Sequence, residues 1–211
     1  KNYLVQELSN SFLIIANNNS NFNISENLLA VVNSFQRHAA YAITTKFILS
    51  SNDKIDVIKE KFEKNILFEN SPFSISPERI SYLKLKSIHS QLIEAISKNE
   101  FYEIEKYLTI WQSTIKEVAL EGSYTINGTT YVSGNYFDLQ PNNILIDDDI
   151  PLIIDEEWCV DFYIPLPVIA IRYFRHLLKF NELENKIEER FPIHRILSLV
   201  LGDDVAVTKS D

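Results

Sequence analysis

The chain has 211 residues, of which 45% are hydrophobic, and a formal net charge of −9 at neutral pH. A chain of this length buries roughly 70% of the surface that its unfolded form exposes, which is enough for one large core or two smaller ones. The negative charge argues against a nucleic-acid partner, because affinity for phosphate backbones comes from Lys and Arg side chains that displace counterions.

Cysteine content and hydropathy indicate where the chain works. The single cysteine, Cys159, cannot form an internal disulfide, which favours a reducing compartment. The apolar stretches fall far short of the ~20 residues that span a bilayer, so we expect no transmembrane segment and a cytoplasmic location. Because the chain begins at Lys1 and contains no Met, we expect it to be one module of a longer polypeptide.

The first third of the chain is predicted to be a small antiparallel β region. Short β-favouring runs lie at residues 3–16, 28–35, 41–49 and 55–62. The connections between them, "NNNSNFN", "QRHA" and "SNDK", are rich in turn residues. We assign residues 1–75 to this β-rich part.

Helical periodicity begins after Pro77. Apolar residues recur at steps of three and four in two segments, first at Leu85, Ile88, Leu92 and Ile96 and then at Phe101, Ile104, Leu108, Trp111, Ile115 and Val118. This spacing predicts two amphipathic helices with Phe101 and Trp111 in the core. Ser76 as a cap and Pro77 at the first helical position predict a helix start at Ser76-Pro77-Glu78.

Two short β runs, "NILI" and "PLIID", follow, joined by the turn "DDDI" at 147–150, which we expect to be solvated. The tail is predicted to be helical again, in "LPVIAIRYFRHLLKF", in "NELENKIEER" and in "IHRILSLVL". Residues 76–211 therefore form a helical part with one embedded hairpin, and the fold class is α+β.

Polar residues surround this hairpin, at Asp138, Pro141, Asn143 and Asp155. An Asp and an Asn five residues apart occur about once by chance in a chain of this composition, so the context has to carry any claim. One interpretation gives these residues no functional role. In it, Asp138 and Asn143 are ordinary turn residues that close loops, and Asp155 is a strand-end residue paired with a Lys.

The stretches "FDLQPNNILID" and "LIIDEEW" resemble the catalytic and metal-binding loops of kinase-fold small-molecule phosphotransferases, the aminoglycoside and choline kinase-like group. "IDEEW" followed by "IPLPVIAIRYFRHL" is similar to kinase-like modules associated with methyltransferases in bacterial O-antigen chain termination. The match covers roughly residues 134–178. It implies a protein-kinase-like two-lobe fold, with a small antiparallel β N-lobe at 1–75 and a mainly helical C-lobe at 76–211.

The resemblance also implies ATP and Mg²⁺ as cofactors and gives each residue a role. Asp138 accepts the proton of the acceptor hydroxyl, while Asn143 and Asp155 are metal ligands. These assignments agree with the chemistry, because phosphoryl transfer needs neutralised phosphates and an aligned acceptor, and Mg²⁺ prefers oxygen ligands.

The nucleotide-binding residues are less defined by the sequence. Kinase-fold enzymes hold the α and β phosphates with a lysine on the third strand; Lys59 in "VIK" is our choice and Lys61 the alternative. "SFQRHA" would lie over the phosphates but has no glycine, so Ser34 and Arg37 are the candidate phosphate ligands. Glu78 and Glu94 are candidates for the partner of the lysine. The alternative for each of these residues is a position on the surface without a functional role, which would make Lys59 a solvated edge lysine and Arg37 a surface arginine. Both glutamates would likewise be surface residues.

Other reactive residues are less informative. Four scattered histidines and one cysteine have no metal-ligand spacing, which argues against zinc. Cys159 is expected to be a buried structural thiol, and Trp158 either lines a sugar pocket or belongs to the core.

The sequence thus leads to one main hypothesis and two alternatives. The main hypothesis is an ATP- and Mg²⁺-dependent kinase acting on a hydroxyl of a sugar or polysaccharide end, such as an O-antigen or other lipopolysaccharide glycan, with a fused or associated methyltransferase or glycosyltransferase. The first alternative is a catalytically silent kinase fold that binds a partner enzyme or carbohydrate. The second is a non-kinase α+β interaction domain in which the motif is coincidental.

Overall fold

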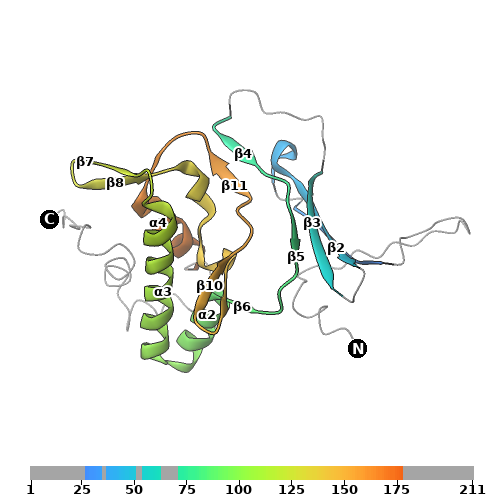
Figure 1. Cartoon of the computed structure of the whole chain (residues 1–211), viewed down its shortest axis with the longest axis horizontal. Helices are drawn as coiled ribbons and strands as arrows, with labels where there is room; N and C mark the ends of the chain where they lie inside the picture. Colours follow the sequence, from blue (N-terminus) through green and yellow to red (C-terminus); the bar gives the residue numbers. More distant parts are fainter. Residues whose placement is uncertain (1–26, 35–36, 51–53, 63–70, 178–211) are drawn as a thin grey trace, which may run out of the picture. The chain divides into compact units, whose positions relative to one another are not determined.

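The computed structural model describes residues 27–34, 37–50, 54–62 and 71–177. The chain divides into two compact units, which we call unit 1 (Lys1–Glu69 with Pro77–Leu83) and unit 2 (Asn70–Ser76 with Lys84–Asp211). In the described part, small antiparallel sheets occur together with three α-helices, so the expected α+β class is confirmed (Figure 1). None of the helices in these ranges has the length and apolar composition needed to cross a bilayer.

Unit 1 contains a four-stranded antiparallel sheet with the strand order β1-β2-β3-β5. Its strands are β1 (Leu28–Asn33), β2 (Ile43–Leu49), β3 (Ile55–Lys61) and β5 (Arg79–Ser81), and a short 3-10 turn, η1 (Ala39–Tyr41), lies between β1 and β2. The strands predicted within residues 28–62 are therefore confirmed. The run predicted at 3–16 lies outside the described residues.

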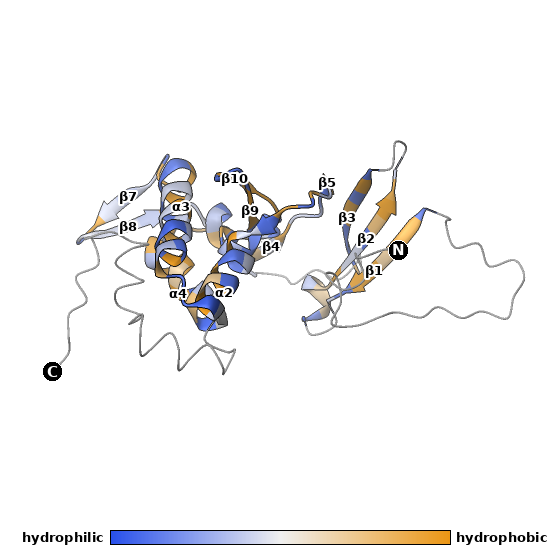
Figure 2. Cartoon of the chain, turned by 90° about the horizontal axis from the view of Figure 1, so that it is seen from below, coloured by the Kyte–Doolittle hydropathy of each residue, from blue (hydrophilic) through white to orange (hydrophobic). Residues whose placement is uncertain are grey.

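Alternation along β2 and β3 explains which face of this sheet is buried. Phe47 on β2 is opposite Val57 on β3, and both are buried. Two residues after Val57, on the same face, Lys59 is only 7% exposed. Figure 2 shows hydrophobic and hydrophilic segments following each other along β3. Lys59 therefore occupies a buried position at which the alternation along β3 would predict an apolar residue.

The helix start predicted at Ser76-Pro77-Glu78 is wrong. The backbone N–H of Ser76 donates to Glu157 O, and Glu78 O accepts from the backbone N–H of Lys59 at 2.8 Å, so the segment runs beside strands. The first described helix of unit 2, α2 (Ile88–Lys98), begins instead after Ser87, whose Oγ accepts from the N–H of Ser90. Ser-Pro-Glu is a good helix-start sequence, but tertiary strand contacts override local propensity here.

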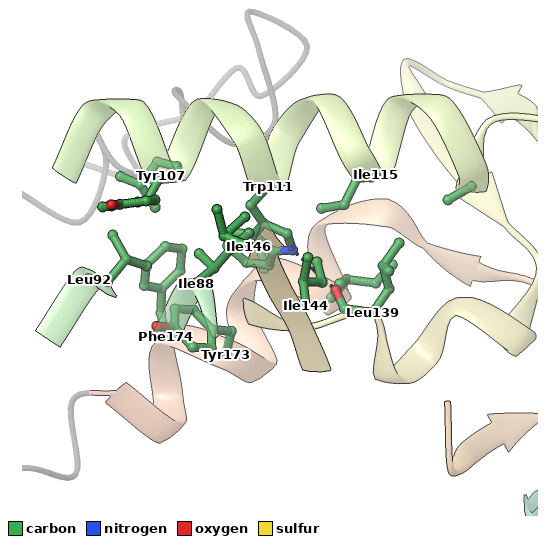
Figure 3. Packing of buried hydrophobic residues seen from close by; sticks show 14 of the residues in the cluster. Ile88, Leu92, Tyr107, Trp111, Ile115, Leu139, Ile144, Ile146, Tyr173 and Phe174 are labelled. Atoms are coloured by element: carbon green, nitrogen blue, oxygen red, sulfur yellow. Dashed lines mark hydrogen bonds between the residues drawn. The ribbon is translucent and has the colours of Figure 1, made fainter. Parts of the chain in front are cut away.

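The core of unit 2 is formed by α2, α3 (Phe101–Ala119) and α4 (Leu166–Leu177). Trp111 of α3 is fully buried, and its ring centroid is 5.2 Å from that of Tyr173 and 6.0 Å from that of Phe174 on α4. Figure 3 shows these rings close to the aliphatic side chains of α2 and of the hairpin. The two helices predicted after Pro77 and the beginning of the helix predicted in "LPVIAIRYFRHLLKF" are confirmed, whereas those predicted in "NELENKIEER" and "IHRILSLVL" lie outside the described residues. Phe101 is 42% exposed, because it is the first residue of α3 and lies at the end of the packed region.

Three small sheets complete unit 2, with the orders β10-β9-β6, β11-β4 and β12-β8-β7. Their strands are β4 (Phe73–Ile75), β6 (Lys86–Ser87), β7 (Tyr124–Ile126), β8 (Thr129–Val132), β9 (Ile144–Asp147), β10 (Ile150–Ile153), β11 (Trp158–Val160) and β12 (Ile164–Pro165).

The predicted hairpin is β9–β10, which is joined by Asp148 and Asp149 with φ values of 46° and 67°. Positive φ at both central residues is the geometry of a type I′ turn. Both side chains are exposed, as expected, and Asp149 forms an ion pair of 2.7 Å with Lys106.

Candidate active site

The loop that carries Asp138 links β8 to β9 through two 3-10 turns, η2 (Gly134–Asp138) and η3 (Pro141–Asn143). It begins at Gly134, where the backbone passes so close to β11 that a Cβ would overlap the carbonyl oxygens of Val160 and Phe162. Only glycine fits this position without displacing backbone. The start of the loop is therefore fixed against the strand that follows Asp155.

Asn143 brings the three predicted residues together. Its Nδ2 donates to the main-chain oxygen of Asp138 at 2.9 Å and to that of Asp155 at 3.1 Å, and the residue is only 5% exposed. Its Oδ1 accepts a hydrogen bond of 2.8 Å from Asn142 Nδ2. The buried amide thus ties two loops that lie on either side of the hairpin, with Asn143 also accepting the backbone N–H of Ile154 through its own carbonyl.

The backbone of Asp155 is in the left-handed region, with φ of 57°. Aspartate is tolerated there better than most residues, yet such conformations persist only where the surrounding structure imposes them, and they occur often at functional sites. The residue is half-buried just beyond the end of β10. The strained backbone marks Asp155 as more than a continuation of the strand.

The carboxylate of Asp138 is buried and paired. Arg172 Nη1 on α4 donates to Asp138 Oδ1 at 2.8 Å and to the main-chain oxygen of Phe137 at 2.9 Å. Burial raises the pKa of Asp138; the charge and the hydrogen bond of Arg172 act in the opposite direction, and the nearby Asp155 and Glu157 raise it further. The pKa remains above its ordinary value because burial dominates.

Three buried side chains lie near this loop, of which Gln140 and Glu157 were not singled out from the sequence. Trp111 Nε1 donates to the main-chain oxygen of Leu139 at 3.1 Å. Gln140 is 5% exposed, and its Nε2 has no hydrogen-bond partner among the described residues. Glu157 is 6% exposed. A buried donor without a partner costs about 1–3 kcal/mol, which makes Gln140 a position where a bound group would be stabilising.

In unit 1, Lys59 and Glu78 form an ion pair with 3.3 Å between Nζ and Oε1. The lysine side chain is 8% exposed and the glutamate side chain 23%. Although this distance is close, Glu78 Oε1 accepts no hydrogen bond of good geometry among the described residues. Lys61, the alternative lysine, is half-buried.

The other candidate partner of the lysine, Glu94, lies elsewhere. It is on the surface of α2 and binds Lys86 at 2.6 Å and Lys98 at 2.7 Å. Those two contacts lower the pKa of Glu94 to about 2, the hydrogen bond of Lys86 being the largest cause. Of the two glutamates considered, the one paired with Lys59 is Glu78.

The candidate phosphate ligands of unit 1 are only partly described, because residues 35–36 lie outside the described ranges. Ser34 Oγ accepts from the backbone N–H of Ile43 at 2.7 Å and lies 3.3 Å from Ile43 O. The backbone N–H of Arg37 donates to Ser34 O at 3.1 Å, and both residues are half-buried. The Ser34 hydroxyl therefore already serves to join the end of β1 to the start of β2.

The two remaining residues of interest pack beside β4. Trp158 is half-buried, with its ring centroid 6.3 Å from that of Phe73. Cys159 is half-buried rather than buried as expected, because its Sγ lies on β11 facing the exposed Ser74, with 2.6 Å between Sγ and Oγ.

In the part of the chain that the structure describes, acidic side chains do not gather into a dense metal site. Within the described ranges, no group of three or more His, Cys, Asp or Glu side chains is placed to hold a metal ion. The predicted ligand set of one carboxylate and one amide oxygen is smaller than such a group.

Comparison of the chain with protein-family models, with curated protein sequences and with solved structures gives no match. Function therefore has to be argued from the geometry of the two units.

Proposed function

We propose that the chain is an ATP- and Mg²⁺-dependent phosphotransferase with a kinase-like two-lobe fold, whose acceptor is a hydroxyl of a sugar or of a polysaccharide end. The observation that carries the proposal is the pair of hydrogen bonds through which Asn143 joins the backbones of Asp138 and Asp155. The Asn143 amide thereby holds together the backbone segments that carry the two proposed functional carboxylates, those of Asp138 and Asp155. The acceptor class, and a methyltransferase or glycosyltransferase as partner, rest on the resemblance of "IDEEW" and the segment after it.

The reaction asks for a base beside the acceptor. The acceptor oxygen forms a bond to the γ-phosphorus, the bond from that phosphorus to the β,γ-bridging oxygen breaks, and its electron pair leaves with ADP. The proton of the acceptor hydroxyl passes to Asp138. A raised pKa suits this role, since a base is most effective when its pKa lies nearer the working pH.

The residues also fit a magnesium ion. Asn143 Oδ1 and the Asp155 carboxylate are hard oxygen ligands, and Mg²⁺ is commonly held by one or two protein ligands together with phosphate oxygens and waters. The ion would neutralise phosphate charge. The bond between Asn143 Nδ2 and the main-chain oxygen of Asp155 fixes the orientation of the amide, and Oδ1, which accepts one hydrogen bond from Asn142, has a second lone pair that would bind the ion.

Unit 1 offers a lysine of the required kind. Lys59 is buried on the same face of β3 as Val57 and forms an ion pair with Glu78, which directs its ammonium. An ammonium so held is suited to the α and β phosphates of a nucleotide.

A catalytically silent module that binds a partner enzyme or carbohydrate is the second candidate. The observation that favours it is the use of the Ser34 hydroxyl by the backbone of Ile43, in a connection with no glycine. Backbone amides approach phosphates most easily where glycine is present.

Nucleotide binding is the first test. Titration of the chain with ATP and Mg²⁺ should raise its melting temperature, since a ligand at about 100 times its Kd stabilises a protein by about 2.7 kcal/mol. Asp155→Asn should remove the Mg²⁺-dependent part of the shift, whereas Asp148→Asn in the exposed β9–β10 turn should leave it unchanged. If millimolar nucleotide does not change the melting temperature, the proposal of a kinase is wrong, and the catalytically silent binding module becomes the favoured function.

Turnover separates the active enzyme from the silent one. ADP release should depend on an added sugar or glycan acceptor. Asp138→Ala should lower turnover by about 10²- to 10⁴-fold while the nucleotide-induced shift persists, because the base is lost and the metal ligands remain. Turnover that survives both Asp138→Ala and Asp155→Asn would show that these roles are wrong.

A further inference from the structure

Arg172 lies in an apolar helix and points toward the Asp138 loop. Its neighbours along α4, Ile169, Ala170, Tyr173 and Phe174, are buried in the core of unit 2. The helix backbone at Arg172 is therefore held in place by packing. The arginine side chain is 33% exposed and that of Asp138 9%.

One nitrogen of Arg172 binds two acceptors. Nη1 donates to Asp138 Oδ1 at 2.8 Å and to Phe137 O at 2.9 Å, and the guanidinium carbon lies 4.2 Å from the centroid of the Phe137 ring. A single donor shared by a side chain and the preceding carbonyl fixes the carboxylate relative to its own backbone. Stacking on Phe137 restricts the orientation of the guanidinium plane.

The rest of the loop is held by other groups. Asp138 O accepts from Asn143 Nδ2 and from the backbone N–H of Gln140, and Leu139 O accepts from Trp111 Nε1. Each of these bonds positions the main chain. Only the contact with Arg172 reaches the reacting carboxylate of Asp138 among the described residues.

We propose that Arg172 is a positioning residue, which binds Oδ1 of Asp138 so that Oδ2 is the oxygen presented to the acceptor hydroxyl. Among the described residues, Asp138 Oδ2 accepts no hydrogen bond, whereas Oδ1 is occupied by the guanidinium. Arg172 also compensates the charge of a carboxylate that lies near Asp155 and Glu157. The inference rests on the proposed function for its catalytic part, and the hold of Arg172 on Asp138 can be measured without it.

The kinetic test compares three variants of the full chain. Arg172→Gln should lower kcat by about 10- to 100-fold, since misplacing a reacting group by about 1 Å can cost 10²-fold, while KM for ATP changes less than about threefold. Arg172→Lys keeps a positive donor and should recover part of kcat. Arg175→Gln alters an exposed arginine of the same helix and should behave as the wild type.

Two kinetic outcomes would overturn the proposal. An unchanged or increased kcat in Arg172→Gln would mean that the arginine is neutral or blocks the base. Parallel losses in kcat, in nucleotide affinity and in melting temperature, with no recovery in Arg172→Lys, would mean that it only supports the fold.

A second measurement needs no activity. Arg172→Gln leaves the buried Asp138 carboxylate unpaired, so the melting temperature should fall, and adding Asp138→Asn should restore at least half of the loss. No recovery in the double variant would overturn the proposed hold. If the wild-type chain transfers no phosphoryl group, the proposed function is wrong. In that case the recovery of the melting temperature in the double variant still decides whether Arg172 holds Asp138.

Discussion

Among the described residues, each unit has one ion pair with a buried member, and the two pairs differ in their hydrogen-bond geometry. In unit 2, Asp138 and Arg172 are 2.8 Å apart with good hydrogen-bond geometry, and the same nitrogen also binds a carbonyl. In unit 1, Lys59 and Glu78 are 3.3 Å apart, and Glu78 Oε1 accepts no hydrogen bond. The comparison separates a pair joined by a hydrogen bond of good geometry from one in which the glutamate Oε1 accepts no hydrogen bond among the described residues.

This difference fits the two proposed tasks. A base gains from being held in one orientation, because any motion away from the acceptor lowers the rate. A lysine that has to bind phosphate gains from a loosely bonded partner, because a strong hydrogen bond would have to be broken first. The predictions below either remove this contrast or make it measurable.

The largest expected effect comes from the support of the Asp138 loop. Gly134→Ala should lower the free energy of unfolding by about 3 kcal/mol, because the added Cβ meets the backbone of β11 rather than a movable side chain. Gly122→Ala is the matched control: its φ of 73° imposes strain of about 1–2 kcal/mol, but no atom lies within 4 Å of the added group. Equal losses in urea unfolding would contradict the close packing of η2 on β11.

Double-mutant cycles should give a smaller effect and rank the two pairs directly. The coupling free energy of Arg172→Gln with Asp138→Asn should be about 2 kcal/mol, below the 3–5 kcal/mol of a fully buried pair because the arginine is 33% exposed. The coupling of Lys59→Gln with Glu78→Gln should be about 1 kcal/mol, because Nζ and Oε1 are 3.3 Å apart and Glu78 Oε1 accepts no hydrogen bond among the described residues. A larger coupling in unit 1 than in unit 2 would reverse the contrast.

The pH dependence of stability should reveal the buried carboxylate. Since the pKa of Asp138 in the folded chain lies above its ordinary value of 3.8, the folded chain binds more protons than the unfolded chain in the interval between the two values. The free energy of unfolding should therefore decrease as pH rises from below 3.8 through the folded-state pKa. Asp138→Asn should flatten this part of the curve, and an unchanged slope in that variant would assign the dependence to other groups.

The exposed cluster of Glu94 with Lys86 and Lys98 should give the smallest effect. Because the pKa of Glu94 is lower in the folded chain than its ordinary value of 4.5, the ionised Glu94 stabilises the folded chain above pH 4.5. This contribution is lost as the pH falls from 4.5 toward about 2. Because all three side chains are exposed, the difference between wild type and Glu94→Gln should be slight at low salt and vanish at 1 M salt. A salt-independent difference would show that the cluster is less exposed than described.

Regular patterns allowed much of the fold to be predicted. Helical spacing identified α2, α3 and α4, and alternating runs with turn residues identified β1, β2, β3 and the β9–β10 hairpin. The helix start at Ser76 was wrong because strand pairing of Glu78 with Lys59 outweighs a favourable local sequence. A helix-cap sequence reports only on the residues next to it. It cannot reveal the competing hydrogen bond between Glu78 and Lys59, because Lys59 lies 19 positions earlier in the chain.

The site was predictable where its residues are close in sequence. Asp138, Asn143 and Asp155 were identified as a set, and the structure joins them through one amide. Arg172 was missed because its partner is 34 residues away, although a lone arginine in the apolar run "VIAIRYF" was a usable signal. Glu157 was quoted only within "IDEEW", and its burial could not be predicted because three consecutive acidic residues give no sign of which one faces the interior.

The indole of Trp111 gives the molecule an internal optical probe. It is fully buried in the core and is hydrogen-bonded to the residue that follows Asp138, so its emission is sensitive to any shift of that backbone. The chain contains only one other tryptophan, Trp158, so replacing that residue with Phe leaves a single fluorophore. Movement of the loop when a small molecule binds can then be followed by intensity and wavelength in real time, without attaching a dye.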